Sequence, residues 1–429
     1  MAAPVGLGAA PDGRLVLDRL HELPGGPQLI ELAARRDDVE LVGGAVRDLL
    51  IGRQPRELDV VVADSAEVFA EQIAAAVGAR SVEGHERFGT AVVRWAGGQI
   101  DVARRRSESY AHPGALPDTH PGTTEQDLTR RDFTVNAIAV PLAGSEHGRL
   151  RYADGALDDL AAHQLRVLHP RSFIDDPTRL LRLARYRARL GFELEEGTAR
   201  LASEAIAADA LQTVSPARIG AELRLALDEP DPVAALASLQ QLGALPALHE
   251  TLVFDRQVVL TALSVLPECD DASSQVLLLA SLLLPRRDYD ATDYQTRLRV
   301  LLDEWEFPAV ERERTVRSVL LAPRIAERLG VAERASQIYE VAHQEPLEAI
   351  ALAAALAERR GQQAAADAAR RWLANLRHEQ LEIGGDDLLA AGVAAGPEVG
   401  RRLRQALLRK LDCELDGREA ELRAALEDR

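Results

Sequence analysis

The hydrophobic pattern of the sequence changes near residue 140, and this change constrains the fold more than any other feature. Before it, runs rich in β-branched residues alternate with helical runs. The runs predict strands at 39–44, 58–63, 90–95 and 98–103, and a helix at 66–77. From about residue 156 the chain is rich in Ala and Leu, with the 3.6-residue period of helices. We therefore expect an α+β fold, in which a small mixed sheet of four or five strands with helices precedes an all-helical part.

The length of 429 residues favours several domains. Pro and Gly punctuation suggests where they divide. We expect a flexible leader at 1–27, a head at 28–155, a helical neck at 156–230, a helical body at 231–330 and a helical tail at 331–429. The tail contains Gly396 before Pro397, a pair that favours the start of a helix, followed by several arginines. Packing of this tail on itself is the alternative to a contact with phosphate.

Composition limits where the protein works. No run of 18 apolar residues is present, so we expect no membrane contact, and the first residues lack the basic and apolar regions of a secretory signal. Cys269 and Cys413 are the only cysteines, too isolated for a disulfide framework. We therefore expect a cytoplasmic protein, and the sequence indicates no protein partner.

The charge distribution indicates one local site for a polyanion. The net charge of −17 argues against a protein that coats nucleic acid without selection. Residues 166–192 nevertheless contain seven arginines and only two acidic residues. A basic segment in an acidic chain favours one binding site for phosphate groups.

Gly43 and Gly44 lie between a predicted strand and a predicted helix that begins near Ala45. Backbone amides at such a turn can bind a phosphate, and Arg47 lies one helical turn further on. A simple tight turn is the alternative.

Glu57 and Asp59 are two residues apart in a predicted strand, so their side chains face the same way. Like charges in an apolar strand are unfavourable unless a cation shares them, and carboxylate oxygens suit Mg²⁺. Asp101 would join them if 98–103 lay beside 58–63. Three such acids near a phosphate-binding turn are typical of two-metal phosphoryl transfer. A solvent-facing strand edge is the alternative.

Residues 104–127 show no period and predict a long irregular loop with a functional role. After it, Asp176 and Pro177 predict a helix start. Three-residue spacing then predicts one helix face for Asp176, Arg179, Arg182 and Arg185. An aspartate that accepts and an arginine that donates hydrogen bonds could address the edge of a base. A solvated helix with salt bridges is the alternative.

Four motifs resemble class II tRNA nucleotidyltransferases, the branch of the DNA polymerase β superfamily that includes CCA-adding enzymes and bacterial poly(A) polymerases. They are GGAVRD with ELD (43–59), FGTAVV (88–93), RRDFTVNA (130–137) and DDPTRLLRLARYRARLGF (175–192). The resemblance is strong over about residues 38–230. It implies a polymerase-β-like head with a helical neck, body and tail, and a tail that contacts tRNA.

The resemblance also implies roles for single residues. Gly43, Gly44 and Arg47 would hold a nucleoside triphosphate, and Arg131 would contact the nucleotide. Glu57, Asp59 and Asp101 would be the catalytic acids that bind two Mg²⁺ ions, although the family has aspartate where this chain has Glu57. The Asp176–Arg179 pair would select C and A without a nucleic-acid template. Arg182 and Arg185 would contact the same nucleotide.

The implied function is the addition of C, C and A to tRNA 3′ ends from CTP and ATP. Addition of A alone, addition of CC alone, and poly(A) synthesis remain alternatives, as does an inactive RNA-binding homologue, for which Glu57 is the argument. The acidic balance of residues 201–429 disfavours a poly(A) polymerase, and the full length of 104–129 disfavours a CC-adding enzyme.

Overall fold

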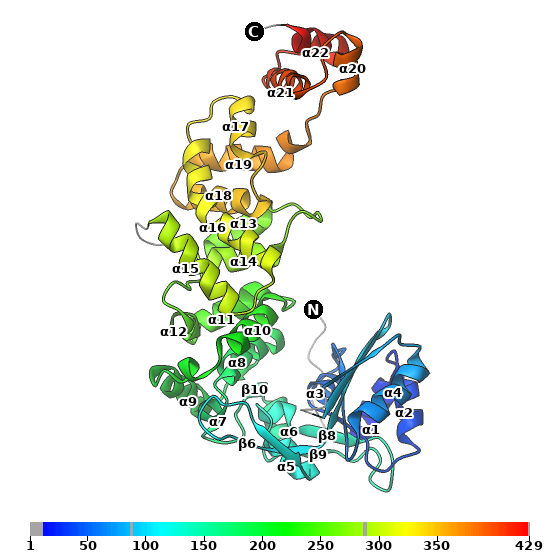
Figure 1. Cartoon of the computed structure of the whole chain (residues 1–429). Helices are drawn as coiled ribbons and strands as arrows, with labels where there is room; N and C mark the ends of the chain where they lie inside the picture. Colours follow the sequence, from blue (N-terminus) through cyan, green and yellow to red (C-terminus); the bar gives the residue numbers. More distant parts are fainter. Residues whose placement is uncertain (1–11, 86–88, 286–289, 428–429) are drawn as a thin grey trace. The chain divides into compact units, whose positions relative to one another are not determined.

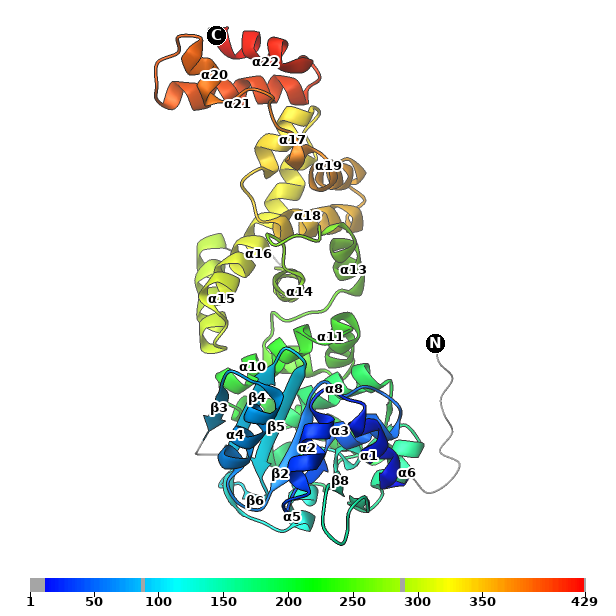
Figure 2. The same ribbon diagram turned by 90° about the vertical axis from the view of Figure 1, so that its right-hand side faces the viewer.

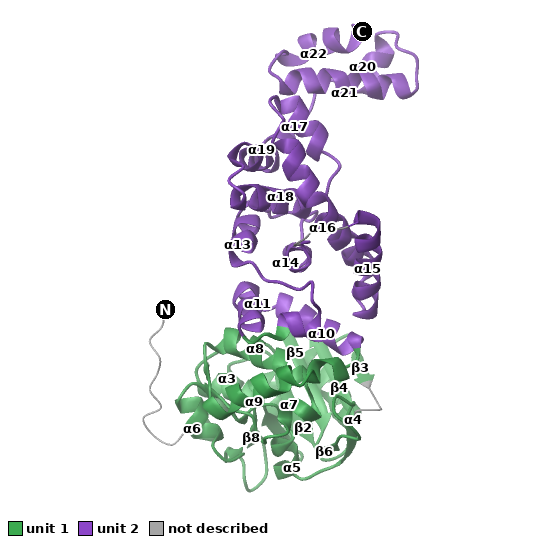
Figure 3. Cartoon of the chain, turned by 90° about the vertical axis from the view of Figure 1, so that its left-hand side faces the viewer, with its two compact units in different colours: residues 1–215, 242–244 green, residues 216–241, 245–429 purple. Residues whose placement is uncertain are grey.

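The computed structural model describes residues 12–85, 89–285 and 290–427 (Figure 1). The chain forms two compact units, one of residues 1–215 and 242–244 and the other of residues 216–241 and 245–429 (Figure 3). The division falls at the start of helix α10 (Pro216–Leu227), inside the predicted neck. The α+β class is confirmed, with the sheet in the first unit and helices in the second. The finer division into neck, body and tail remains a prediction.

The sheet of the first unit has seven strands, two or three more than the sequence predicts. Its order is β3-β4-β5-β2-β1-β8-β9, and only the β2–β5 pair is parallel. The strands are β1 Glu40–Val42, β2 Leu58–Val62, β3 Val82–His85, β4 Thr90–Trp95, β5 Gly98–Arg104, β8 Ile138–Pro141 and β9 Arg151–Tyr152. The local pattern missed β8 and β9 because they are short and join the sheet through β1, about 100 residues earlier in the chain.

Helix α4 (Ala66–Val77) has the predicted bounds and packs on β4 and β5 (Figure 2). It begins where the Ser65 hydroxyl accepts a hydrogen bond from the amide of Val68 (3.3 Å). It ends at Gly78, whose φ of +69° suits a residue without a Cβ atom. The predicted hairpin of β4 and β5 is also present, with Trp95 opposite Gly98. Phe88, which begins the FGTAVV motif, lies outside the described residues.

The predicted leader is wrong for the part that the structure describes. Helix α1 covers Gly13–His21 and helix α2 covers Gly26–Ala33. Val16 and Leu20, one helical turn apart in α1, are both fully buried, so this segment belongs to the core of the first unit. Residues 1–11 lie outside the described residues.

The segment predicted as an irregular loop, 104–127, contains regular structure. Strands β6 (Arg106–Ser109) and β7 (Asp118–Pro121) form an antiparallel pair, here called the 106–121 hairpin, and helix α5 (Thr124–Thr129) follows. The two strands are mostly polar, so they lack the alternation of apolar and polar residues that predicts a strand. The two strands pair through backbone hydrogen bonds, and the ion pairs described below attach β6 to the segment that follows α5.

Short elements complete the first unit. They are α3 Gly44–Leu50, η2 Thr134–Asn136, α6 Ala156–Ala161, β10 Gln164–Leu165, α7 Ser172–Asp175, α8 Thr178–Leu190, β11 Glu193–Leu194, α9 Glu196–Ala207 and η3 Ala210–Thr213. Strands β10 and β11 form a separate parallel pair. Helix α8 ends at Gly191, whose φ is +68°.

The second unit is helical throughout the residues described. Its helices after α10 are α11 Pro232–Gln241, α12 Ala244–Leu248, α13 Arg256–Val265, α14 Ser274–Leu282, α15 Ala291–Glu304, α16 Ala309–Leu329, α17 Ala335–Ala342, α18 Leu347–Arg359, α19 Gln363–Ala374, η4 Leu376–His378, α20 Gly385–Ala390, α21 Pro397–Leu411 and α22 Gly417–Leu426. Alanine-rich α18 is buried on most sides and packs on α13, α16 and α19, because small side chains allow helices to approach closely. Ile383, Leu388, Ala406 and Ala425 form a separate core near the C-terminus. None of the described helices combines the length and apolar character needed to span a membrane.

Candidate active site

Two of the predicted acids lie on neighbouring strands. Strands β2 and β5 run parallel, and their register places Asp59 directly opposite Asp101. From the sequence we expected Asp101 to lie near Asp59 only if residues 98–103 paired beside residues 58–63. The two segments do pair in this way. Glu57 directly precedes β2, two residues before Asp59. The three acids therefore lie on, or directly before, two adjacent interior strands of the sheet.

The electrostatics of Asp59 suit a cation. Burial and then the nearby carboxylate of Glu57 raise the pKa of Asp59 to about 7, with a further contribution from Asp101, while Arg131 opposes the rise. Burial also raises the pKa of Asp101, although a hydrogen bond from Nε2 of Gln99 (2.7 Å) opposes this. Crowded carboxylates of this kind are stabilised by a divalent ion. In the described ranges, however, no group of three or more His, Cys, Asp or Glu side chains is arranged as a metal site.

The predicted phosphate turn faces the acids. Gly43 has a φ of +70° and precedes helix α3, which starts at Gly44. A Cβ atom at Gly43 would lie 2.6 Å from Nη1 of Arg131 and 3.6 Å from Oδ2 of Asp59. The left-handed backbone conformation explains the glycine, since a side chain there would be strained even if the end of the Arg131 side chain moved away. The structure thus brings Gly43, Arg131 and Asp59 together.

Arg47 lies beneath this turn and is almost completely buried, with 1% of its side chain exposed. Nη2 of Arg47 lies 2.7 Å from Oδ1 of Asp48, and Nη1 donates to Oδ1 of Asn136. The guanidinium also lies over the ring of Tyr186, 5.3 Å from its centroid. Arg47 therefore fixes α3 against η2 and α8, and its predicted contact with a triphosphate remains a prediction.

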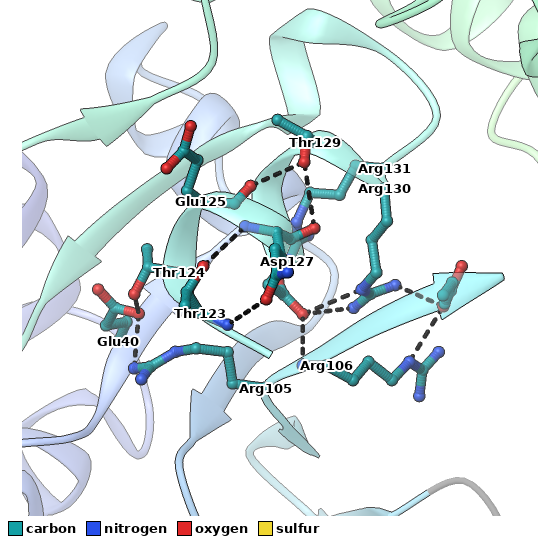
Figure 4. A network of polar contacts seen from close by, with 12 residues as sticks. Glu40, Arg105, Arg106, Thr123, Thr124, Glu125, Asp127, Thr129, Arg130 and Arg131 are labelled. Carbon is teal, nitrogen blue, oxygen red and sulfur yellow. Dashed lines mark hydrogen bonds and ion pairs between the residues drawn. The ribbon is translucent and has the colours of Figure 1, made fainter. Parts of the chain in front are cut away.

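Arg130 and Arg131 share one buried acid, Asp127 of helix α5 (Figure 4). Nη2 of Arg131 donates to Oδ2 of Asp127 (2.8 Å), and Nη2 of Arg130 donates to Oδ1 (2.7 Å). Nη1 of Arg130 also donates to Glu108 in the 106–121 hairpin (2.9 Å). These ion pairs attach the hairpin to the segment that carries Arg131.

Helix α8 does not present a solvated row of arginines. Arg179 is 4% exposed and Arg185 is 7% exposed, so the alternative of a solvated helix is wrong for both. Arg179 donates from Nη1 to the Ser172 hydroxyl (2.6 Å) and from Nη2 to the carbonyl oxygen of Arg130 (2.7 Å). These contacts hold its side chain in one conformation.

Asp176 and Arg182 take different roles at this helix. Oδ1 of Asp176 accepts hydrogen bonds from the hydroxyl (2.7 Å) and the amide (3.2 Å) of Thr178. Asp176 lies two residues before α8, whose N-cap is Pro177, so the predicted acidic cap contacts the first residue of the helix from one position earlier than the N-cap. Nε and Nη2 of Arg182 both donate to Oδ2 of Asp132 (2.9 and 2.6 Å). Burial would raise the pKa of Asp132, but Arg182 and a hydrogen bond from Asn136 lower it to about 2.

Sequence reasoning missed the acids that hold the arginines. Asp127, Asp132 and Glu108 each contact at least one arginine of the site. The spacing of Asp127 from Arg130 and Arg131, three and four residues in a helix, is a signal that could have found the first. Asp132 and Arg182 are 50 residues apart, so no local pattern reports their contact.

Comparison with known proteins identifies the family. Residues 39–166 match the poly(A) polymerase head domain. The chain is 33% identical over 418 residues to the A-adding tRNA nucleotidyltransferase of Geobacter sulfurreducens, an alignment that covers 93% of this chain and 46% of that relative. It is 40% identical over 244 residues to the CC-adding tRNA nucleotidyltransferase of Deinococcus radiodurans, which covers 55% of this chain and 63% of that one. The chain spans about half the length of the curated relatives it matches.

A solved structure matches nearly the whole chain. The Thermotoga maritima CCA-adding enzyme, in a complex with tRNA_CCA, superimposes with a TM-score of 0.75 at 25% identity, over 97% of this chain and 98% of that one. Both units of the fold are therefore shared. The head-domain match, the tRNA nucleotidyltransferase relatives and the CCA-adding enzyme structure together support the class II family of CCA-adding tRNA nucleotidyltransferases and bacterial poly(A) polymerases for this chain.

Proposed function

We propose that this protein adds C, C and A to the 3′ ends of tRNA, using CTP and ATP and no nucleic-acid template. The observation that carries the proposal is the parallel register of Asp59 and Asp101 beside Gly43 and Arg131. Nucleotidyl transfer needs carboxylates that bind metal ions next to hydrogen-bond donors for a triphosphate. Asp59 and Asp101 supply the carboxylates, and Gly43 and Arg131 supply the donors. The similarity to enzymes that act on tRNA supports the choice of substrate.

Within this proposal, Glu57, Asp59 and Asp101 hold two Mg²⁺ ions. The ions would supply Lewis-acid stabilisation of the transferring phosphoryl group. Glu57 is one methylene longer than the aspartate usual in the family, but it still offers a carboxylate near Asp59, whose pKa it raises. The raised pKa of Asp59 is consistent with a site that prefers to bind cations.

The protein's own residues bind and orient the nucleotide. The amides of Gly43 and Gly44 and the guanidinium of Arg131 hold the triphosphate, and Arg47 supports the turn from below. Asp176 and Arg179 read the base edge, with Arg182 and Arg185 on the same helix. Arg179 suits this role because its contacts with Ser172 and Arg130 fix it before a nucleotide arrives.

Addition of A alone is a second candidate. The relative from Geobacter sulfurreducens that covers 93% of this chain is an A-adding enzyme. Such an enzyme would need the same acids and the same phosphate turn, so the geometry described here suits both functions.

The test uses three forms of one tRNA, ending at the discriminator base, after one added C and after two added Cs. Each is incubated with CTP alone, ATP alone or both, and the 3′ ends are sequenced. The proposal predicts a complete CCA end on all three forms. An A-adding enzyme extends only the form that ends in CC, a CC-adding enzyme stops before A, and a poly(A) polymerase adds a run of A to all three forms from ATP alone. A protein that binds tRNA but adds no nucleotide to any form would contradict an enzymatic function.

A further inference from the structure

Asp127 is a buried acid that contacts two neighbouring arginines of the candidate site. It is 2% exposed and accepts from Arg131 at Oδ2 and from Arg130 at Oδ1, where the distances are 2.8 Å and 2.7 Å (Figure 4). A second bond to Oδ1 comes from Nε of Arg130 (3.0 Å). Burial would raise the pKa of Asp127, but Arg131 and Arg130 lower it, so the carboxylate is ionised. Each of its two oxygens serves a different arginine.

The Arg131 side of this contact leads to the phosphate turn. Nη1 of Arg131 approaches Gly43 so closely that a Cβ atom there would lie 2.6 Å away. The same guanidinium lowers the pKa of Asp59, which places its charge within electrostatic reach of the acids. A change in the position of Arg131 would therefore alter the hydrogen-bond donors at the place where the triphosphate is proposed to bind.

The contact with Arg130 connects Asp127 to helix α8, which carries Arg179. Arg130 is the last residue of the turn that ends α5, and its carbonyl oxygen accepts from Nη2 of Arg179 (2.7 Å). The contact between Asp127 and the Arg130 side chain holds that last turn of α5 together, since the two residues are three apart. Arg130 also reaches Glu108, which accepts from the Tyr110 hydroxyl (3.1 Å). Burial and then Glu108 raise the pKa of Tyr110 to about 12, with smaller effects of Arg179 and Asp176.

We propose that Asp127 is a positioning residue that aligns both ends of the nucleotide site. Through Arg131 it positions the donors for the triphosphate, and through Arg130 it positions Arg179, which reads the base. The inference rests on the proposed function, because it assigns a role within the same site. It goes beyond that function by making one carboxylate responsible for both affinity and base choice.

Chemistry explains why an aspartate is needed. Arginine offers only donors, so a residue between two guanidinium groups must accept on both sides. Asparagine has the same shape but replaces one oxygen with an NH₂ group, which would face a donor whichever way the amide turned. Asp127→Asn should therefore present an NH₂ group to one arginine and remove the negative charge from the contact with the other, so that both are held less firmly while the packing volume is preserved.

The test compares Asp127→Asn with Glu125→Gln, a matched control on the same helix. Glu125 is exposed, and its substitution removes the same charge without touching either arginine. For each full-length variant, incorporation of CTP, ATP, UTP and GTP into tRNA is measured, together with equilibrium binding of the four nucleotides, tRNA affinity and thermal unfolding. For Asp127→Asn we expect kcat/KM for the correct nucleotide to fall by about 10- to 100-fold, as for loss of one or two charge-assisted contacts. Discrimination against UTP and GTP should fall by at least about tenfold.

Two further variants, each at one arginine partner of Asp127, separate a positioning role from an effect on general stability. Arg131→Lys should weaken all four nucleotides alike, and Arg130→Lys should reduce base discrimination with little change in overall affinity. These variants also test the proposal if Asp127→Asn does not fold. Asp127→Asn protein that lowers all four nucleotides in equal proportion would overturn the inference, as would unchanged discrimination in Arg130→Lys.

The readouts also separate failure of this inference from failure of the proposed function. Wild-type protein that adds no nucleotide to tRNA contradicts the function. Equilibrium binding of the four nucleotides to the wild type and to Asp127→Asn still decides the positioning role in that case. Equal binding selectivity in the two proteins would contradict it.

Discussion

Arginine is used in two different ways in the first unit and in the C-terminal helices of the second. In the first unit, Arg47, Arg179 and Arg185 are each less than a tenth exposed, and the contacts described for Arg47 and Arg179 are specific hydrogen bonds. In the second unit, Arg401 and Arg418 are more than half exposed and pair with acids at the surface. Burial of a guanidinium is unfavourable unless partners replace its water, whereas a surface pair contributes little. Equal density of arginine in a sequence therefore does not mean an equal role.

The contrast extends to the acids. Asp127 and Asp132 are buried and hold arginines of the candidate site, and the pKa of each is lowered despite burial. Glu398 in α21 is partly exposed and binds Arg401 at the surface and the partly buried Arg402. We therefore expect single substitutions to have large effects in the first group and small effects in the second. The following experiments test this difference.

The largest effect is expected for Asp59→Ala. Loss of a proposed metal ligand should reduce nucleotide addition by about 1,000-fold or more, because metal ions supply several kcal/mol of transition-state stabilisation. Affinity for tRNA should change by less than about twofold. Incorporation and tRNA binding are measured on the same preparation, with Asp64→Ala as a control, since that acid follows the same strand and is exposed. An active Asp59→Ala protein would rule out the metal assignment, and Glu57→Asp should retain or raise activity if the glutamate is a tolerated ligand.

A smaller effect, on base choice, is expected for Arg179→Ala. If Arg179 reads the base edge, its loss should remove on the order of 1–3 kcal/mol of discrimination. Use of CTP should fall by about 10- to 100-fold, and rejection of UTP and GTP should weaken. Arg182→Ala should instead slow all four nucleotides alike. Single-nucleotide incorporation efficiencies check both, and a proportional loss of all four in Arg179→Ala would show that Arg179 acts only through its charge.

Substitution of Asp132 by Asn should affect stability. The folded pKa of Asp132 lies below its unfolded value, so the ionised pair with Arg182 stabilises the fold above about pH 4. This contribution is lost as the pH falls towards 2. Asp132→Asn should lower the free energy of unfolding by about 2 kcal/mol at pH 7, and it should show a weaker acid dependence than the wild type. Urea unfolding at pH 7, 4 and 3 measures this, and parallel curves for the two proteins would contradict the pairing as a source of stability.

The smallest effect is expected for Glu398→Gln. This acid lies at the surface, and Arg401 and Arg402 are its partners in α21. Because water can replace the lost contacts, thermal unfolding should match that of the wild type. A clear fall in melting temperature would show that the C-terminal pairs resemble those of the first unit, and the difference between the two units would not hold.

The sequence alone determined the features that depend on local pattern. The bounds of α4, the hairpin of β4 and β5, and the start of α21 at Pro397 follow from short-range periodicity, caps and turn residues. The motifs around Gly43, Glu57, Arg131 and Asp176 were enough to indicate the family. The same reasoning failed for the 106–121 hairpin, because polar strands carry no alternation of apolar residues.

Only the tertiary structure decided which charges are buried and which acid serves which arginine. Arg47 meets Asn136 across 89 residues, and Arg179 meets the carbonyl of Arg130 across 49. Strands β8 and β9 join the sheet through β1, which a local window cannot register. A helix period places Arg179, Arg182 and Arg185 on one face, but it does not say whether that face meets water or protein. Desolvation and hydrogen-bond geometry settle that question, and both depend on segments that are distant in the sequence.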